Sequence, residues 1–198
     1  MLRFFFFSCV LPVTFTDNHD TQRSASNVLT YKDGEYYNAA NYFMLAHPYG
    51  HPKVMSSYYF TDTDAGPPTV PVHDGSTLHC SDGSTWVCEH RRPGIAGMVG
   101  FRLATAGADA SDWQYDASNA NRCAFQRGSL GFFALNMDPG SAWSTQLRAG
   151  VPDGTYCDVV TSGGGNSTCP STVVVSGGYV NVNVPSLSAV AIYVGRMA

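Results

Sequence analysis

The sequence predicts an α/β segment followed by an all-β domain, and the order of local patterns leads to this conclusion. Up to residue 105 the patterns run strand, helix, strand, helix, an order that favours parallel βαβ packing. After residue 105, short β-rich segments alternate with Gly, Pro, Asn and Ser, which is typical of a Greek-key β-sandwich. Apolar residues make up 44% of the chain and charged residues 13%, so we expect a packed core and no long disordered stretch.

The α/β segment contains two predicted strands and two predicted helices, with one long loop. In chain order, the strand, helix, strand, loop and helix are residues 11–17, 34–47, 54–58, 61–85 and 86–104. Apolar side chains recur at helical spacing in both predicted helices, and Pro93-Gly94 in the second predicts a kink or a late start. Two βα units alone leave a strand edge unpaired and helix faces uncovered, so we expect the tail of something larger.

The all-β domain contains six or seven predicted strands. They lie near residues 122–126, 130–136, 143–147, 154–159, 172–175, 179–184 and 189–194. The boundary falls near Thr105–Ser111, which divides the chain into residues 1–10, 11–105 and 106–198. Residues 1–10 superficially resemble a signal peptide but are followed by no small-x-small cleavage site, so we expect a shortened start instead.

Charge and hydrophobicity restrict the partners. The net charge is −4 and Arg91-Arg92 is the only adjacent basic pair, which argues against nucleic acid. No apolar run approaches the roughly 20 residues that span a bilayer, so we expect no membrane partner. Low charge with 13% aromatic residues favours a secreted protein that handles neutral polar ligands such as sugars. Asn166-Ser167-Thr168 is an N-glycosylation acceptor, which agrees with secretion.

Four of the six cysteines form two close pairs in the sequence, Cys80 with Cys88 and Cys157 with Cys169. This spacing predicts two local disulfides and an oxidising compartment. Each disulfide would stabilise the fold by about 2.5–3 kcal/mol in the chain-entropy model. Zinc binding is the rival interpretation, but Cys88-Glu89-His90 lacks matching partners at ligand spacing.

A dense group of polar side chains ends the first predicted strand, in Phe15-Thr16-Asp17-Asn18-His19-Asp20. In (β/α)₈ barrels, active-site residues sit at the carboxyl ends of the strands. Asp20 is therefore a candidate active-site carboxylate, and His19 is a candidate neutral donor to sugar hydroxyls. A helix cap or a polar turn is the alternative interpretation of Asn-His-Asp.

Residues 15–23 closely resemble the fourth conserved motif of animal-type α-amylases, Phe-Val-Asp-Asn-His-Asp-Asn-Gln-Arg. Further segments resemble the same family, in consistent order: residues 43–50, 54–58, 86–91, 98–102 and 154–159. The resemblance covers residues 11–198, and residues 1–10 match nothing. It implies that residues 11–105 are the last two βα units of a (β/α)₈ TIM barrel and that residues 106–198 are the family's C-terminal all-β domain.

The resemblance also implies roles for individual residues. Asp20 would be the third carboxylate of the active site, which stabilises the transition state and binds the sugar together with His19. Asn18 would belong to the chloride site of many animal members, and Lys53 stands where chloride-dependent relatives carry an arginine. A lysine ammonium supplies positive charge without a bidentate fork, so we expect weak or absent chloride dependence. A plain surface lysine is the alternative.

The implied activity is endo-hydrolysis of α-1,4-glucosidic bonds in starch or glycogen by a secreted, monomeric, retaining parent enzyme. Such hydrolysis needs a nucleophile and an acid/base. In this family both lie upstream, as do the calcium ligands. We therefore expect calcium in the full-length parent, no metal site in this chain, and no activity from the chain alone. A transglycosylase of the same family would use the same carboxylates.

A non-catalytic carbohydrate-binding or structural module is the second hypothesis. Trp113, Tyr115 and Trp143 lie in the aromatic-rich β domain and offer flat apolar faces that stack on sugar rings. The alternative is that these side chains belong to the core between the sheets or to a domain interface.

Overall fold

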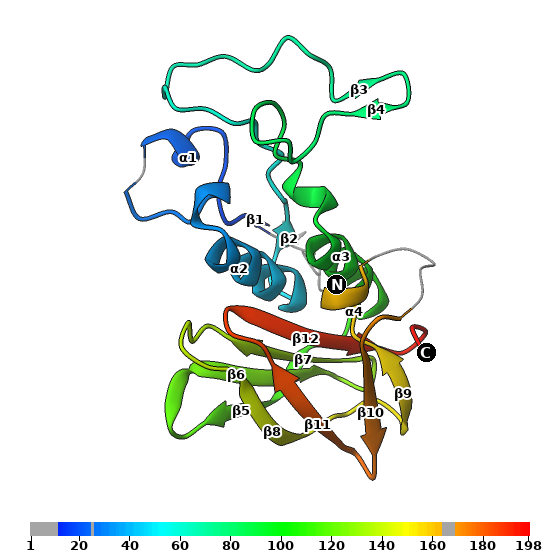
Figure 1. Cartoon of the computed structure of the whole chain (residues 1–198). Helices are drawn as coiled ribbons and strands as arrows, with labels where there is room; N and C mark the ends of the chain where they lie inside the picture. Colours follow the sequence, from blue (N-terminus) through cyan, green and yellow to red (C-terminus); the bar gives the residue numbers. More distant parts are fainter. Residues whose placement is uncertain (1–11, 25, 164–168) are drawn as a thin grey trace, which may run out of the picture.

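The computed structural model describes residues 12–24, 26–163 and 169–198. A small helical part lies against one face of a β-sandwich, and a long excursion of the chain extends from the helical part on the side away from the sandwich (Figure 1). The predicted division into a mixed α/β part and a β-sandwich is confirmed in this form. Residues 1–10 and the predicted glycosylation site Asn166 lie outside the described residues.

The helical part contains short strands and three-residue 3₁₀ turns around two longer helices. Its elements are β1 (Val13–Thr14), α1 (Thr21–Ser24), η1 (Tyr31–Asp33), α2 (Glu35–Ala46), β2 (His51–Pro52), β3 (His73–Asp74), β4 (Thr77–Leu78), η2 (Glu89–Arg91) and α3 (Pro93–Ala104). Strands β1 and β2 pair in parallel, with Val13 opposite His51. This pairing across α2 confirms the predicted βαβ order.

The strand predicted at residues 54–58 is wrong in position, because the second strand is His51–Pro52. The last backbone bond to β1 is the one that Lys53 N–H donates to Thr14 O, at 2.8 Å. Beyond it, the backbone of Ser57 bonds elsewhere: its N–H donates to the Glu89 carboxylate and its carbonyl accepts from Val87 N–H. The chain therefore leaves the parallel pair to meet the segment before η2.

The helix predicted at residues 86–104 begins later, at Pro93, which confirms the late start that Pro93-Gly94 indicated. Proline fits the first helical position, where its missing N–H has no helical partner to lose. Residues 89–91 form only the separate turn η2, because Arg92 between it and Pro93 adopts an extended backbone with ψ of 132°. In the loop predicted at 61–85, the antiparallel pair β3–β4 is an addition that the sequence did not indicate.

The sandwich consists of two four-stranded antiparallel sheets. Its strands are β5 (Ala110–Asp116), β6 (Asn119–Arg127), β7 (Gly131–Asn136), β8 (Trp143–Arg148), β9 (Gly154–Cys157), β10 (Thr172–Ser176), β11 (Tyr179–Val184) and β12 (Ser188–Tyr193), with α4 (Val159–Ser162) after β9. The sheet orders are β12-β7-β6-β5 and β8-β11-β10-β9. In the second sheet, β8 lies beside β11, while β9, β10 and β11 are consecutive antiparallel neighbours, with α4 in the connection from β9 to β10. This arrangement is the predicted Greek key.

Seven of these strands lie where the sequence predicts them, and β5 is the one that its pattern does not indicate. This strand lies at a sheet edge and its register with β6 is interrupted by irregularities. It also carries Asp112 and Asp116, a residue type depleted in strands. The strand predicted at 154–159 is shorter than expected because Asp158 caps α4, accepting a hydrogen bond from Val160 N–H.

The sheet that contains β7 is covered on both faces. One apolar cluster fills the space between the two sheets and includes Phe132 and Trp143. A second cluster joins the outer face of the same sheet to α2 and α3, with Phe101, Phe125 and Phe133 fully buried in it. All six residues of β7 are therefore buried. Helix α3 also approaches α4 so closely that a Cβ added at Gly97 would clash with the carbonyl of Val159.

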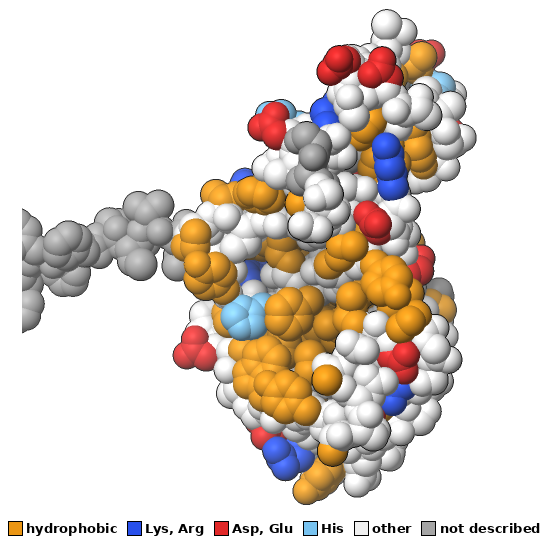
Figure 2. Space-filling model, turned by 90° about the vertical axis from the view of Figure 1, so that its left-hand side faces the viewer, with side chains coloured by type: hydrophobic (Ala, Val, Ile, Leu, Met, Phe, Trp, Pro, Cys, Tyr) orange, Lys and Arg blue, Asp and Glu red, His pale blue; other side chains and the backbone are white. Residues whose placement is uncertain are grey.

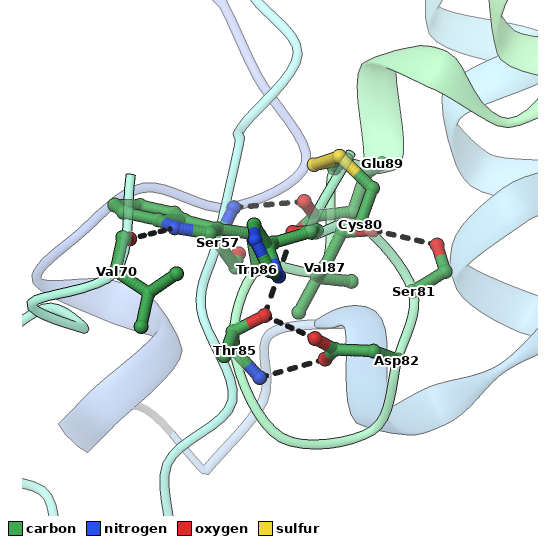
Figure 3. Close-up of a disulfide and its surroundings, with 11 residues drawn as sticks. Ser57, Val70, Cys80, Ser81, Asp82, Thr85, Trp86, Val87 and Glu89 are labelled. Carbon is green, nitrogen blue, oxygen red and sulfur yellow. Dashed lines mark hydrogen bonds between the residues drawn. A yellow bond between two sulfur atoms is a disulfide. The ribbon is translucent and has the colours of Figure 1, made fainter. Parts of the chain in front are cut away.

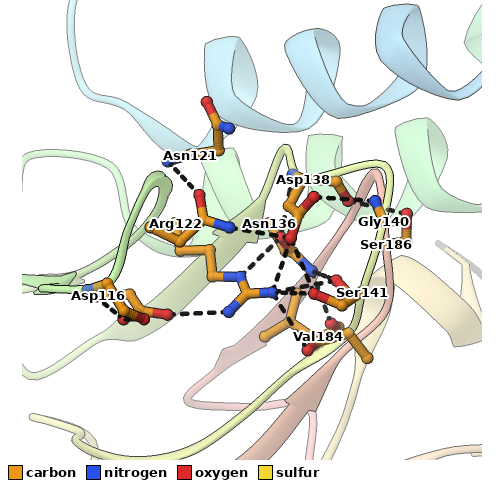
Figure 4. Close-up of polar contacts among 12 residues, drawn as sticks. Asp116, Asn121, Arg122, Asn136, Asp138, Gly140, Ser141, Val184 and Ser186 are labelled. Carbon is orange, nitrogen blue, oxygen red and sulfur yellow. Dashed lines mark hydrogen bonds and ion pairs between the residues drawn. The ribbon is translucent and has the colours of Figure 1, made fainter.

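A polar network around Arg122 holds one end of the sandwich together (Figure 4). The Arg122 guanidinium donates to the carboxylates of Asp116 and Asp138, each at 2.9 Å. Asn136 Oδ1 accepts from Arg122 and its Nδ2 donates to Ser141 O at 2.8 Å. The single Arg122 cation is shared by the carboxylates of Asp116 and Asp138, so the network joins β5, β6 and the connection after β7.

Two arginines connect the sandwich, the helices and the loop after α2. Arg127 at the end of β6 is 1% exposed and donates to the backbone carbonyls of Ala46, Thr105 and Ala108. Burial lowers the pKa of Arg127 to about 10, so the side chain stays cationic at neutral pH. Arg102 in α3 donates in the same way to the carbonyls of the turn that follows α2.

We expect Arg127→Met to lower the free energy of unfolding by about 3 kcal/mol, because three backbone carbonyls, two of them in buried bonds, would lose the guanidinium. The matched control is Arg148→Met, which removes an exposed ion pair with Asp112 and should cost less than about 1 kcal/mol. Urea denaturation of both variants and of the unmodified chain measures the difference. Equal losses in the two variants would contradict a special role for Arg127.

Candidate functional site

The segment that sequence analysis singled out follows directly from β1. His19 and Asp20 are strongly exposed, each with a side-chain exposure of 80%, and His19 Nε2 lies 3.5 Å from Asp20 Oδ1. Because β1 and β2 are parallel, their carboxyl ends meet at the same edge. The two predicted sugar-binding side chains therefore project from that edge into solvent.

Asn18 forms the turn that carries these two residues. Its Oδ1 accepts hydrogen bonds from the backbone N–H groups of Asp20 and Thr21, each at 2.9 Å. Its own backbone N–H donates to Thr21 Oγ1 at 3.0 Å, and its carbonyl accepts from Gln22 N–H. The cap interpretation thus holds for Asn18. Its carboxamide oxygen is occupied in the turn, which leaves the amide NH₂ as the group that would face an anion.

Asp17 is a buried member of the same segment that sequence analysis gave no role. It is 2% exposed, and its Oδ1 accepts a hydrogen bond from Tyr37 Oη at 2.9 Å. Its Oδ2 is buried and has no hydrogen-bond partner among the described residues. Burial raises the pKa of Asp17 to about 6; the hydrogen bond from Tyr37 opposes this rise and the nearby Glu89 carboxyl adds to it.

Glu89 is the second buried carboxyl at this site. It is fully buried, and its Oε2 accepts a hydrogen bond from Ser57 N–H at 2.8 Å. Figure 3 shows this bond close to the disulfide of Cys80, with Ser57 and Glu89 facing each other. Ser57 Oγ in turn donates to Gln22 Oε1 at 2.9 Å. The sequence indicated Glu89 only as part of the possible zinc pattern Cys88-Glu89-His90. No local pattern shows that this acidic side chain is buried.

Lys53 and Asn18 do not line the same cavity. It is exposed and borders a hollow of about 760 Å³ between β2, α3 and the end of β6. Arg102 and Arg127 line this hollow together with aliphatic side chains such as Val99 and Leu103. The hollow therefore combines an apolar wall with the Lys53, Arg102 and Arg127 side chains, two histidines and Asp109, and its lining does not include the Asn18–Asp20 turn.

The three aromatic side chains predicted to contact sugar have different environments. Trp143 is 5% exposed and lies in the core between the sheets. Trp113 packs on Phe125, with ring centroids 4.5 Å apart, where the sandwich meets α2. Tyr115 is 67% exposed and stacks on Trp113. Hydrophobic side chains gather on one face of the molecule around this junction (Figure 2).

The structure pairs the cysteines as their spacing predicted, Cys80 with Cys88 and Cys157 with Cys169. Within the described residues, no group of three or more His, Cys, Asp or Glu side chains is arranged to hold a metal ion. Over the same ranges, no helix has the length and hydrophobicity needed to cross a bilayer.

Comparison with known proteins shows where this fold belongs. Residues 113–195 match the family described as Alpha amylase, C-terminal all-beta domain. Over 185 residues the chain is 42% identical to an α-amylase of Tenebrio molitor, a match that covers 88% of this chain. The chain is homologous to α-amylases. An α-amylase of Thermomonospora curvata is 44% identical over 186 residues and 92% of the chain.

The crystal structure of α-amylase I from Eisenia fetida matches this α-amylase homologue with a TM-score of 0.78 and 33% identity, over 92% of the chain. These comparisons confirm the resemblance to animal α-amylases. The homologue spans only 38% of the Tenebrio protein, 29% of the Thermomonospora protein and 41% of the Eisenia chain.

We expect Asp17 to make the free energy of unfolding fall as pH rises from about 4 to about 6. In the folded chain, Asp17 keeps its proton up to about pH 6, whereas an ordinary aspartate releases it near pH 3.8. The folded state therefore binds more protons in this window, and stability falls as pH rises through it. Asp17→Asn, which cannot ionise, should flatten this part of the profile.

Urea denaturation of the parent chain and Asp17→Asn between about pH 4 and pH 7 measures this slope. Burial also raises the pKa of Asp158, which contributes in the same direction in both proteins, so the difference between the two profiles is the quantity to read. Parallel profiles would rule out an Asp17 contribution.

Proposed function

We propose that this chain supplies the Asp20 side of the active site in a longer, secreted α-amylase that cleaves internal α-1,4-glucosidic bonds of starch or glycogen. One observation carries the proposal: the Asn18-His19-Asp20 motif follows a parallel strand, with His19 and Asp20 exposed at its end, in a chain that aligns with α-amylases over 88% of its length. A variant of the Eisenia enzyme, whose structure with maltohexaose is known, matches this chain with a TM-score of 0.77.

The proposed roles follow from the chemistry of glycoside cleavage. A retaining glycosidase passes through an oxocarbenium-like transition state and uses two further carboxyl groups as nucleophile and acid/base. Asp20 would accept hydrogen bonds from the sugar hydroxyls and stabilise the positive charge that develops on the ring, and His19 would bind the same sugar. The nucleophile and the acid/base would come from outside this chain. A transglycosylase built on the same carboxylates differs only in how water is managed.

Exposed apolar side chains support packing against further barrel elements. Val13 in β1 is 56% exposed, and Leu103 in α3 is 72% exposed. Phe15 and Val99, from the same two regions, are also exposed. Such side chains on a short parallel pair and on a helix face are the surfaces that neighbouring strands and helices of a (β/α)₈ barrel would cover. Residues 11–105 would then be its last two βα units, joined to the sandwich of residues 106–198.

The remaining parts of the proposal concern ions, partners and location. Calcium would bind the longer enzyme through ligands outside this chain, as the resemblance to animal-type α-amylases implies. The enzyme would act as a secreted monomer on α-glucans, with no nucleic-acid or membrane partner, and would carry a glycan at Asn166. The two disulfides fit an oxidising compartment. A non-catalytic sugar-binding role would depend on Tyr115 alone among the three aromatic candidates, since Trp113 and Trp143 are packed.

We expect Asp20→Asn in the α-amylase that contains this segment to lower kcat on soluble starch about 10³-fold, because the amide cannot supply the negative charge. The control is Asp62→Asn, an exposed aspartate in the loop after β2, which should retain full activity. Reducing-sugar release measures both. The 198-residue chain alone should release no sugar. Activity of Asp20→Asn within about twofold of the parent enzyme would refute the assignment.

We expect chloride to change the kcat of the parent enzyme by less than about twofold, because the Lys53 ammonium already supplies a positive charge. Lys53→Arg should introduce chloride activation, since a guanidinium offers two parallel donors to an anion. Starch hydrolysis measured with and without chloride, at constant ionic strength, tests both statements. Strong activation of the unmodified enzyme would show that lysine does not replace the anion.

A further inference from the structure

The turn that carries His19 and Asp20 is anchored on both sides by buried side chains. Asp17, immediately before the turn, is 2% exposed, and Gln22, immediately after it, is 8% exposed. Between them, His19 and Asp20 each have a side-chain exposure of 80%. The six-residue segment 17–22 therefore changes from buried to exposed and back again, and the two buried residues flank its exposed part.

The anchor before the turn is a hydrogen bond that Asp17 accepts from Tyr37 of helix α2. Tyr37 in α2 is fully buried and donates from its Oη to Asp17 Oδ1 at 2.9 Å. The Arg92 guanidinium, at the start of α3, lies 5.8 Å from the centre of the Tyr37 ring. Tyr37 thus extends from α2 and packs against the Arg92 side chain at the start of α3. The position of Asp17 therefore depends on how these two helices pack.

The anchor after the turn is a relay of two hydrogen bonds. Gln22 Oε1 accepts from Ser57 Oγ at 2.9 Å, and Ser57 N–H donates to Glu89 Oε2 at 2.8 Å. Glu89 is held in turn by the Cys80–Cys88 disulfide that directly precedes it. Figure 3 shows the disulfide, the loop it closes and the Ser57–Glu89 bond in one view.

These five residues are called the buried clamp: Asp17, Gln22, Tyr37, Ser57 and Glu89. We propose that the buried clamp positions the Asn18–Thr21 turn, and that its members are positioning residues for Asp20 that do not touch the sugar. The catalytic part of this inference rests on the proposed function. The structural part, that the clamp orders the turn, does not.

Two features of the clamp indicate more than ordinary packing. Asp17 Oδ2 and Glu89 Oε1 are buried without a hydrogen-bond partner among the described residues, although each such group costs desolvation energy. Glu89 also acts electrostatically on Asp17, so two carboxyl groups are buried near each other. Local violations of hydrogen-bond satisfaction are expected at functional sites, where a displacement of about 1 Å can cost a factor of about 10² in rate.

The test uses substitutions that each remove one hydrogen bond of the clamp. Ser57→Ala disconnects Gln22, and Tyr37→Phe disconnects Asp17. The control is Ser144→Ala in the sandwich, which likewise removes a serine-to-amide bond, from Ser144 Oγ to Asn183 Oδ1 at 2.8 Å. Amide ¹⁵N relaxation of residues 18–21 in the 198-residue chain reports the order of the turn. We expect both clamp variants to lose order there and the control to retain it.

Kinetics of the α-amylase that contains this segment give the second readout. We expect Ser57→Ala and Tyr37→Phe to lower kcat about tenfold to a hundredfold while KM changes less, because glucan contacts made outside the Asn18–Thr21 turn remain whereas Asp20 is misplaced for the transition state. If Ser57→Ala fails to fold, Gln22→Met replaces it, since it nearly keeps the side-chain volume and removes the carboxamide that accepts from Ser57 Oγ.

A pH titration separates the clamp from a purely structural effect. The titratable groups that face Asp17 are Tyr37 from α2 and Glu89 from η2. Amide shifts of residues 18–21 should follow the Asp17 titration, with a midpoint of about pH 6. The midpoint should rise in Tyr37→Phe, which removes a stabilising donor, and fall in Glu89→Gln, which removes a negative charge.

The outcomes separate this inference from the proposed function. Unchanged relaxation of residues 18–21 in folded Ser57→Ala and Tyr37→Phe would overturn the clamp, even if Asp20→Asn abolished starch hydrolysis. A disordered turn in these variants, together with full activity of Asp20→Asn, would leave the clamp as a structural device and overturn the catalytic role of Asp20. Loss of order with a selective fall in kcat supports both.

Discussion

The buried guanidinium of Arg127 connects the sandwich to the rest of the molecule. It bonds to the last carbonyl of α2, at Ala46, and to carbonyls of the segment that follows α3. The last carbonyls of a helix have no partner inside it and form the negative end of its dipole, so a cation satisfies them without a carboxylate. Because both helix ends bond to one side chain of β6, the orientation of α2 and α3 on the sandwich follows from this contact.

The apolar packing around Arg127 makes the two parts of the chain one structure. Strand β7 is buried along its whole length because its sheet faces the second sheet on one side and the helices on the other. Phe101, Phe125 and Phe133 form the contact between helix and sheet. The sandwich therefore supports the helical part. The similarity to α-amylases also extends beyond the C-terminal domain, over 88% of the chain.

The candidate site depends on this support through a short series of contacts. Helix α2 carries Tyr37, Tyr37 binds Asp17, and Asp17 precedes the turn that exposes His19 and Asp20. The same turn is bonded on its other side to Ser57, beside the disulfide-closed loop. The exposed side chains of His19 and Asp20, which we propose to contact the sugar, thus lie on a buried polar base. Buried carboxyls with unsatisfied oxygens reduce stability, and this cost is expected where geometry matters more than stability.

Local periodicity and spacing in the sequence determined much of this protein. Alternating burial in β10 and β11, the helical spacing before Pro48, the close cysteine pairs and the motif at residues 15–23 are all visible within short windows. Tertiary structure alone decided the position of β2, the edge strand β5, the core position of Trp143 and the burial of Glu89. The physical reason is that periodicity reports which face of an element is apolar, whereas these features depend on hydrogen-bond and packing partners that lie far away in the chain and meet only on folding.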